Sequence, residues 1–341
     1  MAVSDDLLDS LTRHDVYLRR YSTATLRKVL AQLRRLDAEV TERLLGEVSD
    51  LSRARQEALL RDIRKVIQSA YRDATGALQV DLDALASYEV RYQTDLFRRV
   101  VPVRLETVTP TPEQVVAAVN ARPFQGRLLR EVYPELAESA WRQVRDTIRA
   151  GFIEGRTTDQ IIRDLRGTAA NGYKDGILAK TRRDVESVVR TAINHTANSA
   201  RESYYEANSD LVKGVRFNAT LDSRTTLVCA GNDGKVFEVG KGPRPPLHYN
   251  CRSSTSPVLK SWRELGFDAD ELPASTRASM SGQVPADLDY DGWLRRQPKE
   301  FQDDVLGERK ADLFRSGTKV DRFTDASGRE YSLAELQRRE Q

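Results

Sequence analysis

Apolar residues recur every three or four positions along the first part of the chain, and this period constrains the fold more than any other feature. The stretch runs from Thr23 to about Tyr71, without a proline and with only Gly46 to weaken it. It predicts one long helix or a hairpin of two, and it fits a coiled-coil seam or a bundle face equally well. The apolar positions are Leu26, Leu30, Leu33, Leu36, Val40, Leu44, Val48 and Leu51.

This apolar stripe has no evident mate elsewhere in the sequence. A stripe of that length left uncovered would form a large exposed hydrophobic patch, which soluble proteins rarely keep. We therefore predict that residues 1–100 form a helical N-terminal arm that packs against a partner protein.

Prolines cluster in the next part of the chain. Each proline lacks a backbone donor and restricts the residue before it, so the cluster predicts a Pro-rich linker over residues 101–134. The prolines are Pro102, Pro110, Pro112, Pro123 and Pro134.

Helical periodicity returns after the linker in three segments. The first ends at Gly155, the second begins with a capping threonine at 157 or 158 and ends at Gly167, and the third runs from about Lys180 to Asn208. These segments predict a central helical domain.

The residue types change after this domain. Residues 213–220 and 235–239 are typical of strands, and the turn-forming Asn232, Asp233 and Gly234 lie between them, so we predict a single β-hairpin. A proline-rich loop follows, in which no regular element is expected.

The last part of the chain, residues 263–341, is predicted to be a small C-terminal extension. It contains short helices broken near Pro298 and Gly307, then a turn over 325–328 and a helix capped by Ser332. The expected fold class is therefore mainly α with a small α+β module, built from long N-terminal helices, a central helical domain, a β-hairpin with a Cys/His loop at 213–256, and a C-terminal helical module.

Composition excludes several classes of protein. The chain has 54 Lys and Arg against 51 Asp and Glu, and this near balance does not indicate a nucleic-acid-binding protein. No apolar run reaches the roughly 18 residues that a membrane span needs, and the N-terminus lacks the pattern of a signal peptide, so no membrane partner is expected.

The sequence lacks the residues that three classes of enzyme require. The chain has only three histidines, whereas a nuclease of the His-Asn-His type gathers two or three in one unit. No Glu-x-Glu pair of an ADP-ribosyltransferase and no phosphate-binding GxxxxGK[ST] loop occur. We therefore expect that the protein is not an enzyme.

Cys229, His248 and Cys251 offer two sulfur ligands and one imidazole within a short stretch. This set suits a structural zinc ion, which takes four ligands in a tetrahedron. Two other uses stay open, namely buried cysteines beside a hydrogen-bonded histidine, and a disulfide, which a reducing cytosol disfavours. The candidates for the fourth ligand are Asp222, Asp233, His195 and water.

We predict an ion-pair shell around this loop, formed by Asp222, Arg224 and Arg252. Residues two apart on a strand point to the same face, so Asp222 would pair with Arg224 or Arg252 and hold the loop against the hairpin.

The region from Arg190 to Arg252 resembles the phage head morphogenesis family, whose proteins are similar to the F protein of phage Mu. The family pattern has a D-x-R-T segment, a nearby cysteine, a glycine turn and a closing P-x-H-x-x-C-R. Here these are Asp222 to Thr225, Cys229, Gly234 and Pro246 to Arg252. The resemblance covers about residues 130–260, called here the head-morphogenesis domain at 135–262, and extends to the C-terminal segment.

The resemblance implies a minor capsid protein of a tailed bacteriophage. Such a protein is associated with the portal vertex and acts in head assembly, DNA packaging or ejection. The implied partners are the portal protein, the major capsid or scaffold protein, and packaged DNA. Its implied location is the virion, in the capsid interior or at the portal vertex, after assembly in the host cytoplasm. The alternative is a phage-delivered metal-dependent nuclease or toxin enzyme.

Overall fold

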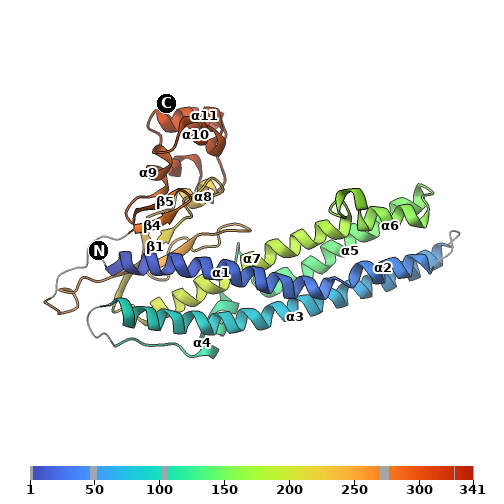
Figure 1. The fold of residues 1–341 in the computed structure, drawn as a ribbon, viewed down its shortest axis with the longest axis horizontal. Helices are drawn as coiled ribbons and strands as arrows, with labels where there is room; N and C mark the ends of the chain where they lie inside the picture. The colour runs from blue at the N-terminus through green and yellow to red at the C-terminus, as the bar shows by residue number, and fades with distance from the viewer. Residues whose placement is uncertain (1–2, 47–51, 102–105, 269–275, 326, 341) are drawn as a thin grey trace. The chain divides into compact units, whose positions relative to one another are not determined.

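Helices dominate the computed structural model, which describes residues 3–46, 52–101, 106–268, 276–325 and 327–340 (Figure 1). The mainly α fold class with a small α+β part is confirmed. The long helices are α1 (Val3–Leu33), α2 (Leu36–Leu45), α3 (Arg53–Val100), α4 (Pro112–Ala121), α5 (Leu129–Ile153), α6 (Thr158–Arg166) and α7 (Ile177–Ala207). The shorter helices are α8 (Leu227–Ala230), α9 (Tyr290–Arg295), α10 (Lys299–Leu306), α11 (Glu308–Arg315) and α12 (Leu333–Glu340). The strands are β1 (Val212–Asn218), β2 (Val236–Phe237), β3 (Ser254–Leu259), β4 (Thr276–Ser279) and β5 (Gly282–Pro285).

The chain divides into two compact units, and neither is one continuous segment. The first unit contains Met1–Arg19, Leu85–Val119 and Asn194–Gln341, and the second contains Arg20–Ala84 and Asn120–Ile193. Helices α1, α3, α4 and α7 therefore contribute residues to both units. The division differs from the sequence-based segments, since residues 1–100 are shared between the two units instead of forming a separate arm.

The second unit is a helical bundle that covers the predicted apolar stripe from within the chain. Leu26, Leu33, Leu36, Val40 and Leu44 are all buried, and Leu30 is half-buried. Buried residues of α3, α5 and α6 complete the core, and α2 and α5 both contact α6. The expectation that this stripe needs a partner protein is therefore wrong, because its mates lie far away in the sequence. Val48 and Leu51 lie outside the described residues.

The Pro-rich segment predicted as a linker contains regular structure. Helix α4 begins at Pro112, where the missing N–H of proline costs little because the first turn has no acceptor for it. Thr111 and Gln114 cap this helix reciprocally: each backbone N–H donates to the other's side chain, at 2.9 and 3.4 Å. Helix α5 begins at Leu129 and contains Pro134 in its second turn. Pro112 and Pro134 therefore belong to helices, whereas Pro110 and Pro123 lie in the irregular segments before and after α4.

Helices α6 and α7 confirm the central helical prediction. Thr157 accepts a hydrogen bond from the backbone N–H of Gln160, whose side chain accepts one from the N–H of Thr157, and Gly167 ends α6 with a positive φ of 89°. Helix α7 covers the predicted third segment within a few residues.

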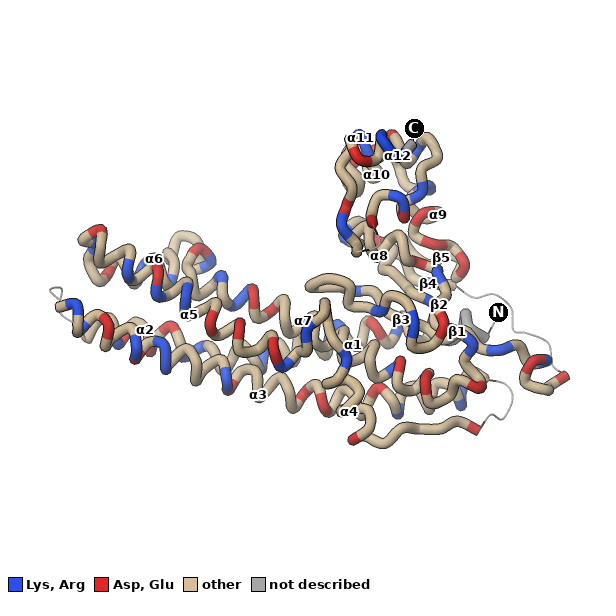
Figure 2. Tube along the Cα trace, turned by 180° about the vertical axis from the view of Figure 1, so that it is seen from behind, with Lys and Arg blue, Asp and Glu red and all other residues tan. Residues whose placement is uncertain are grey.

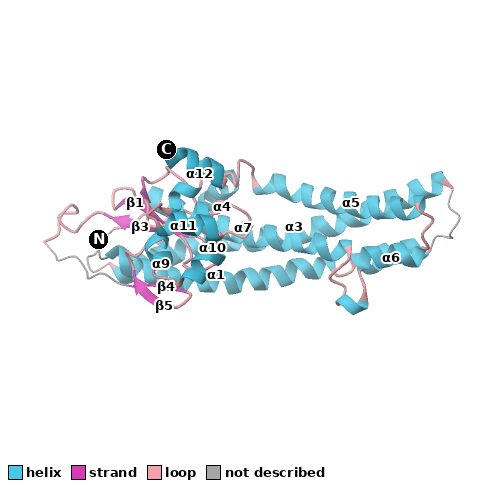
Figure 3. Ribbon diagram, turned by 90° about the horizontal axis from the view of Figure 1, so that it is seen from above, coloured by secondary structure: helices cyan, strands magenta, loops and turns pink. Residues whose placement is uncertain are grey.

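The first unit contains a three-stranded antiparallel sheet of order β2-β1-β3 (Figure 3). Strands β1 and β2 form the predicted hairpin, in which Val215 pairs with Phe237. Strand β3 adds to the other edge of β1, and β4 pairs with β5 in a separate two-stranded sheet. The prediction of a single β element is therefore wrong. The missed β3 has the sequence STSPVL and is buried throughout, so it shows no alternation of polar and apolar residues.

A small hydrophobic cluster of the first unit positions the two cysteines. Phe217 and Ala219 pack with Cys229 and Cys251 in this cluster, and Phe237 of β2 covers it from the hairpin. A larger cluster joins α9, α10 and α11 to η2 (Val320–Phe323) and α12, which confirms the predicted C-terminal helical module. Ser332 accepts the N–H of Glu335 at the start of α12, as predicted, whereas Ala326 in the preceding turn lies outside the described residues.

Charges of both signs are interspersed along the helices (Figure 2). Many of them form ion pairs with exposed side chains, such as Arg64 with Glu138 at 3.0 Å. In the described part of the chain, no helix is both long and apolar enough to cross a membrane.

Candidate functional site

The candidate site lies where a one-turn helix meets the end of the proline-rich loop. Cys229 belongs to α8, which follows β1 after a short turn, and it is 1% exposed. Cys251 lies three residues before the start of β3 and is 4% exposed. His248 precedes it in the loop and is half-buried. Strands β1 and β3 are neighbours in the sheet, so the two segments that carry the cysteines are held side by side.

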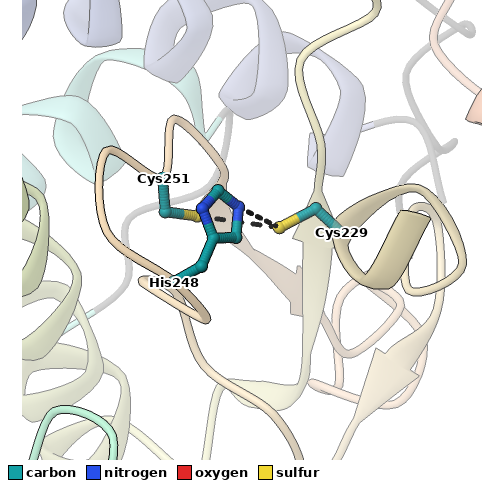
Figure 4. Close-up of side chains that lie close together, drawn as sticks. All are labelled: Cys229, His248 and Cys251. Atoms are coloured by element: carbon teal, nitrogen blue, oxygen red, sulfur yellow. Dashed lines mark hydrogen bonds between the residues drawn. The ribbon is translucent and has the colours of Figure 1, made fainter. Parts of the chain in front are cut away.

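The three side chains come together in the structure (Figure 4). The Sγ atoms of Cys229 and Cys251 are 3.7 Å apart, and His248 Nε2 lies 3.3 Å from the Cys229 Sγ. One ligand atom from each residue lies within 4.8 Å of the other two. The predicted convergence of these residues is therefore confirmed, while the presence of a metal stays a prediction.

The second ring nitrogen of His248 fixes the orientation of the imidazole. Nδ1 lies 2.8 Å from the carbonyl oxygen of Tyr249, which can only accept, so Nδ1 carries the proton and donates it. In the neutral ring, Nε2 then keeps its lone pair and faces the sulfur of Cys229.

The electrostatics of the cluster favour an ionised sulfur. A hydrogen bond from Cys229 and the nearby imidazole of His248 lower the pKa of the Cys251 thiol well below its ordinary value. The hydrogen bond with Cys251 and burial raise the pKa of the Cys229 thiol. The sulfur of Cys251 in turn raises the pKa of His248. Cys251 is therefore the member with the most thiolate character, which is the form that binds metals.

The predicted ion-pair shell forms between Asp222 and Arg252 but not through the side chain of Arg224. Arg252 donates from both terminal nitrogens to the two oxygens of Asp222, one of them at 2.8 Å. Asp222 also accepts the backbone N–H of Arg224 at 3.0 Å, and the Arg224 side chain is exposed. The prediction for Arg224 was wrong because β1 ends at Asn218, so these residues lie in a turn and not on a strand.

The acids and histidine considered for a fourth ligand are engaged elsewhere. Both carboxylate oxygens of Asp222 bind Arg252, and those of Asp233 bind Arg277. His195 Nε2 lies 3.4 Å from the carbonyl oxygen of Val119. Over the described residues, no further His, Cys, Asp or Glu joins the cluster. The described part of the chain thus offers three ligands, and water is the remaining candidate among those considered for the fourth.

The sequence did not indicate the buried pair of Asp233 and Arg277. Arg277 donates to both oxygens of Asp233 at 3.0 and 3.1 Å and to the carbonyl of Ala219 at 2.6 Å. Asp233 also accepts the N–H of Ala219 at 2.6 Å. Burial raises the pKa of Asp233 although Arg277 faces it. The pair ties the turn before β2 to strand β4, and nothing in the spacing of the two residues could have revealed it.

A second buried polar cluster lies in the same unit. Glu89 binds Arg201 Nε at 2.7 Å and His14 Nε2 at 2.7 Å, and Arg201 also binds Asp15 at 2.8 Å. The side chains of Glu89 and Arg201 are both 0% exposed. The ring of His14 stacks on Tyr92 at 3.7 Å between centroids. The cluster joins α1, α3 and α7 within the first unit.

This cluster predicts a loss of stability in acid. Burial alone would raise the pKa of Glu89, but Arg201 and His14 lower it from 4.5 to about 2. A folded-state pKa below the unfolded value stabilises the protein above that unfolded value. The contribution, up to about 3 kcal/mol, is then lost as the pH falls from 4.5 to about 2. Urea denaturation of wild type and Glu89→Gln between pH 7 and 3 measures it. The wild type should lose stability more steeply below pH 4.5, and equal slopes would contradict the assignment.

The region that holds the candidate site matches one protein family. Residues 142–256 match the family model described as Phage Mu protein F like protein. This segment is similar to that family, and we refer to it as the Mu F-like domain, although its residues belong to both compact units. The Mu F-like domain begins in α5, ends in β3, and contains Cys229, His248 and Cys251 together with the Asp222–Arg252 pair. No curated protein and no solved structure matches the chain significantly.

The match covers about a third of the chain and shows similarity to a phage protein family over that part. The family resemblance seen in the sequence is thereby confirmed for this part of the chain. Residues outside 142–256, which include α1 to α4 and the C-terminal helices, are not covered by the match.

Proposed function

We propose that this protein is a minor capsid protein of a tailed bacteriophage, associated with the portal vertex, which acts in head assembly, DNA packaging or ejection. The observation that carries the proposal is the Mu F-like domain at residues 142–256. In this role the protein acts by binding other virion components and not by catalysis.

The surface chemistry supports protein partners first. Basic and acidic residues are interspersed along the helices (Figure 2), and the net charge is only +3, which suits complementary protein surfaces better than a phosphate backbone. The portal protein is the primary partner in this proposal, with the major capsid or scaffold protein second. A contact with packaged DNA would be local and not a general property of the surface.

Co-expression with the portal protein of the same phage tests this assignment. We expect the two proteins to co-purify, and we expect purified virions to contain the protein in a few copies while heads made without it are defective or empty. Normal infectious particles that lack the protein, together with no portal binding, would contradict the proposal. Cryo-electron microscopy of the portal vertex would then locate the chain.

The enzymatic alternative is a phage-delivered metal-dependent nuclease or toxin. A three-ligand cluster with room for water favours it, because catalytic zinc sites keep one open position. The burial of both sulfurs at 1% and 4% exposure opposes it, since a substrate must reach the metal. Incubation of the purified protein with plasmid DNA in zinc or magnesium separates the two functions, and DNA cleavage abolished by Cys251→Ser would favour the enzyme.

A further inference from the structure

We propose that Cys229, His248 and Cys251 bind one zinc ion, which fastens the loop between the two cysteines to the β1–β3 sheet. Water completes the coordination. This site is independent of the role at the portal vertex, so either proposal stands if the other fails.

Two of the three distances between ligand atoms match those of a tetrahedral zinc ion, and the third is within 4.8 Å. With zinc–sulfur bonds of about 2.3 Å, two sulfurs at the corners of a tetrahedron lie about 3.8 Å apart. The Sγ atoms of Cys229 and Cys251 are 3.7 Å apart. A zinc–nitrogen bond of about 2.0 Å predicts a sulfur–nitrogen separation of about 3.5 Å, and the observed separation of Cys229 Sγ and His248 Nε2 is 3.3 Å. A disulfide requires about 2.05 Å between the sulfurs.

The imidazole is oriented as zinc-binding histidines are. The hydrogen bond from Nδ1 to the carbonyl of Tyr249 fixes the tautomer in which Nε2 is the ligand, and such a second bond is found beside most zinc-bound histidines. The backbone N–H of Cys251 donates to the carbonyl of His248 at 3.2 Å. This turn presents the imidazole and the sulfur from one short segment.

The loop between the cysteines is held by two ion pairs, Asp233 with Arg277 and Arg244 with Glu202, and by little apolar packing. It contains four glycines and three prolines, and its one regular element is the two-residue strand β2. Such a segment buries little apolar surface against the entropy of ordering its backbone. An ion that joins Cys229 at one end to His248 and Cys251 at the other would hold the loop closed and restrict the unfolded chain as a cross-link does.

Water is the fourth ligand because no further His, Cys, Asp or Glu of the described residues joins the cluster. The cysteines are buried on the side of the sheet, whereas His248 is half-buried and the next residues, Tyr249 and Asn250, are exposed. Solvent therefore reaches the ion past the histidine.

Metal analysis of the purified protein tests the site. The wild-type protein is equilibrated with zinc, and unbound zinc is then removed. Elemental analysis should find about one zinc ion per chain. Cys251→Ser and His248→Asn should lose most of it, while Tyr249→Phe, which alters the same loop but keeps the carbonyl that holds His248, should retain it. If Cys251→Ser retained as much zinc per chain as the wild type, the proposal would be overturned.

Cobalt substitution keeps the test decisive if the variants fail to fold. Wild type loaded with Co²⁺ should show the intense visible bands of tetrahedral cobalt and a near-ultraviolet band from thiolate ligation. Folded wild type that binds neither metal, or cobalt bound without the thiolate band, would overturn the proposal. An intact mass that shows the loss of two hydrogen atoms under non-reducing conditions would identify a disulfide instead.

Discussion

Replacing Arg201 with alanine is expected to destabilise the protein by about 3–5 kcal/mol, because it leaves the carboxylate of Glu89 buried without its main partner. Arg201 lies 2.7 Å from Glu89, and neither side chain is exposed. Urea denaturation followed by circular dichroism at pH 7 would measure the change in the free energy of unfolding.

Two further variants distinguish the loss of the buried ion pair from the effect of removing an arginine elsewhere. Arg98→Ala removes a guanidinium that is 69% exposed and 3.9 Å from Asp95, so its effect should stay within about 1 kcal/mol. The double variant Arg201→Met with Glu89→Leu removes both charges and should recover much of the lost stability, since apolar residues of similar size replace buried pairs well. If Arg201→Ala were as stable as the wild type, the ion pair of Glu89 and Arg201 would contribute little to stability.

Replacing Asp233 with alanine is the second change with a large expected effect, again about 3–5 kcal/mol. It leaves the guanidinium of Arg277 buried and also removes the acceptor for the backbone N–H of Ala219. The turn before β2 would lose its tie to β4, so thermal unfolding should begin at a markedly lower temperature than in wild type.

The matched control for this variant is Asp210→Ala, which removes an exposed carboxylate from the same unit. It should unfold within a degree or two of wild type, since surface substitutions have small effects. A drop of the same size in both variants would mean that the buried contact of Asp233 is not responsible.

Helices were predicted well where local signals define their ends. Thr157 and Gly167 mark α6 because a cap and a left-handed glycine act within one turn, and the structure agrees with both. The same kind of signal was present before α4, where Thr111, Pro112 and Gln114 form a capping box with proline at the first position. The prolines were interpreted as helix breakers, so the start of α4 was not predicted.

Strands and helix partners were predicted less well because they depend on contacts distant in the sequence. Strand β3 pairs with β1 about forty residues earlier, and its fully buried STSPVL sequence shows neither alternation nor a strong propensity. The apolar stripe of α1 and α2 is covered by α3 and α6, which no local pattern could assign.

The candidate site was predictable because few residues could form it. The chain has only two cysteines, and the spacing of His248 and Cys251 places both on one turn. The shell around them was predicted only in part, since the pairing of Asp222 with Arg252 is present while Arg224 points to solvent. That error came from extending β1 beyond Asn218, and a strand end is set by the partner strand rather than by the residue types.

The division of four helices between the two compact units limits how the gene could be cut and rejoined. Each unit is assembled from separated segments, so a deletion of residues 1–100 would remove parts of both and could not be interpreted as the loss of an appendage. A recombination point inside α3 would build each unit from two parental sequences whose buried surfaces have not been matched to each other. A break after α7 would still divide the first unit, whose core joins Val90 and Phe97 to Val215 and Trp262. Functional chimaeras of this protein should therefore exchange the chain as a whole.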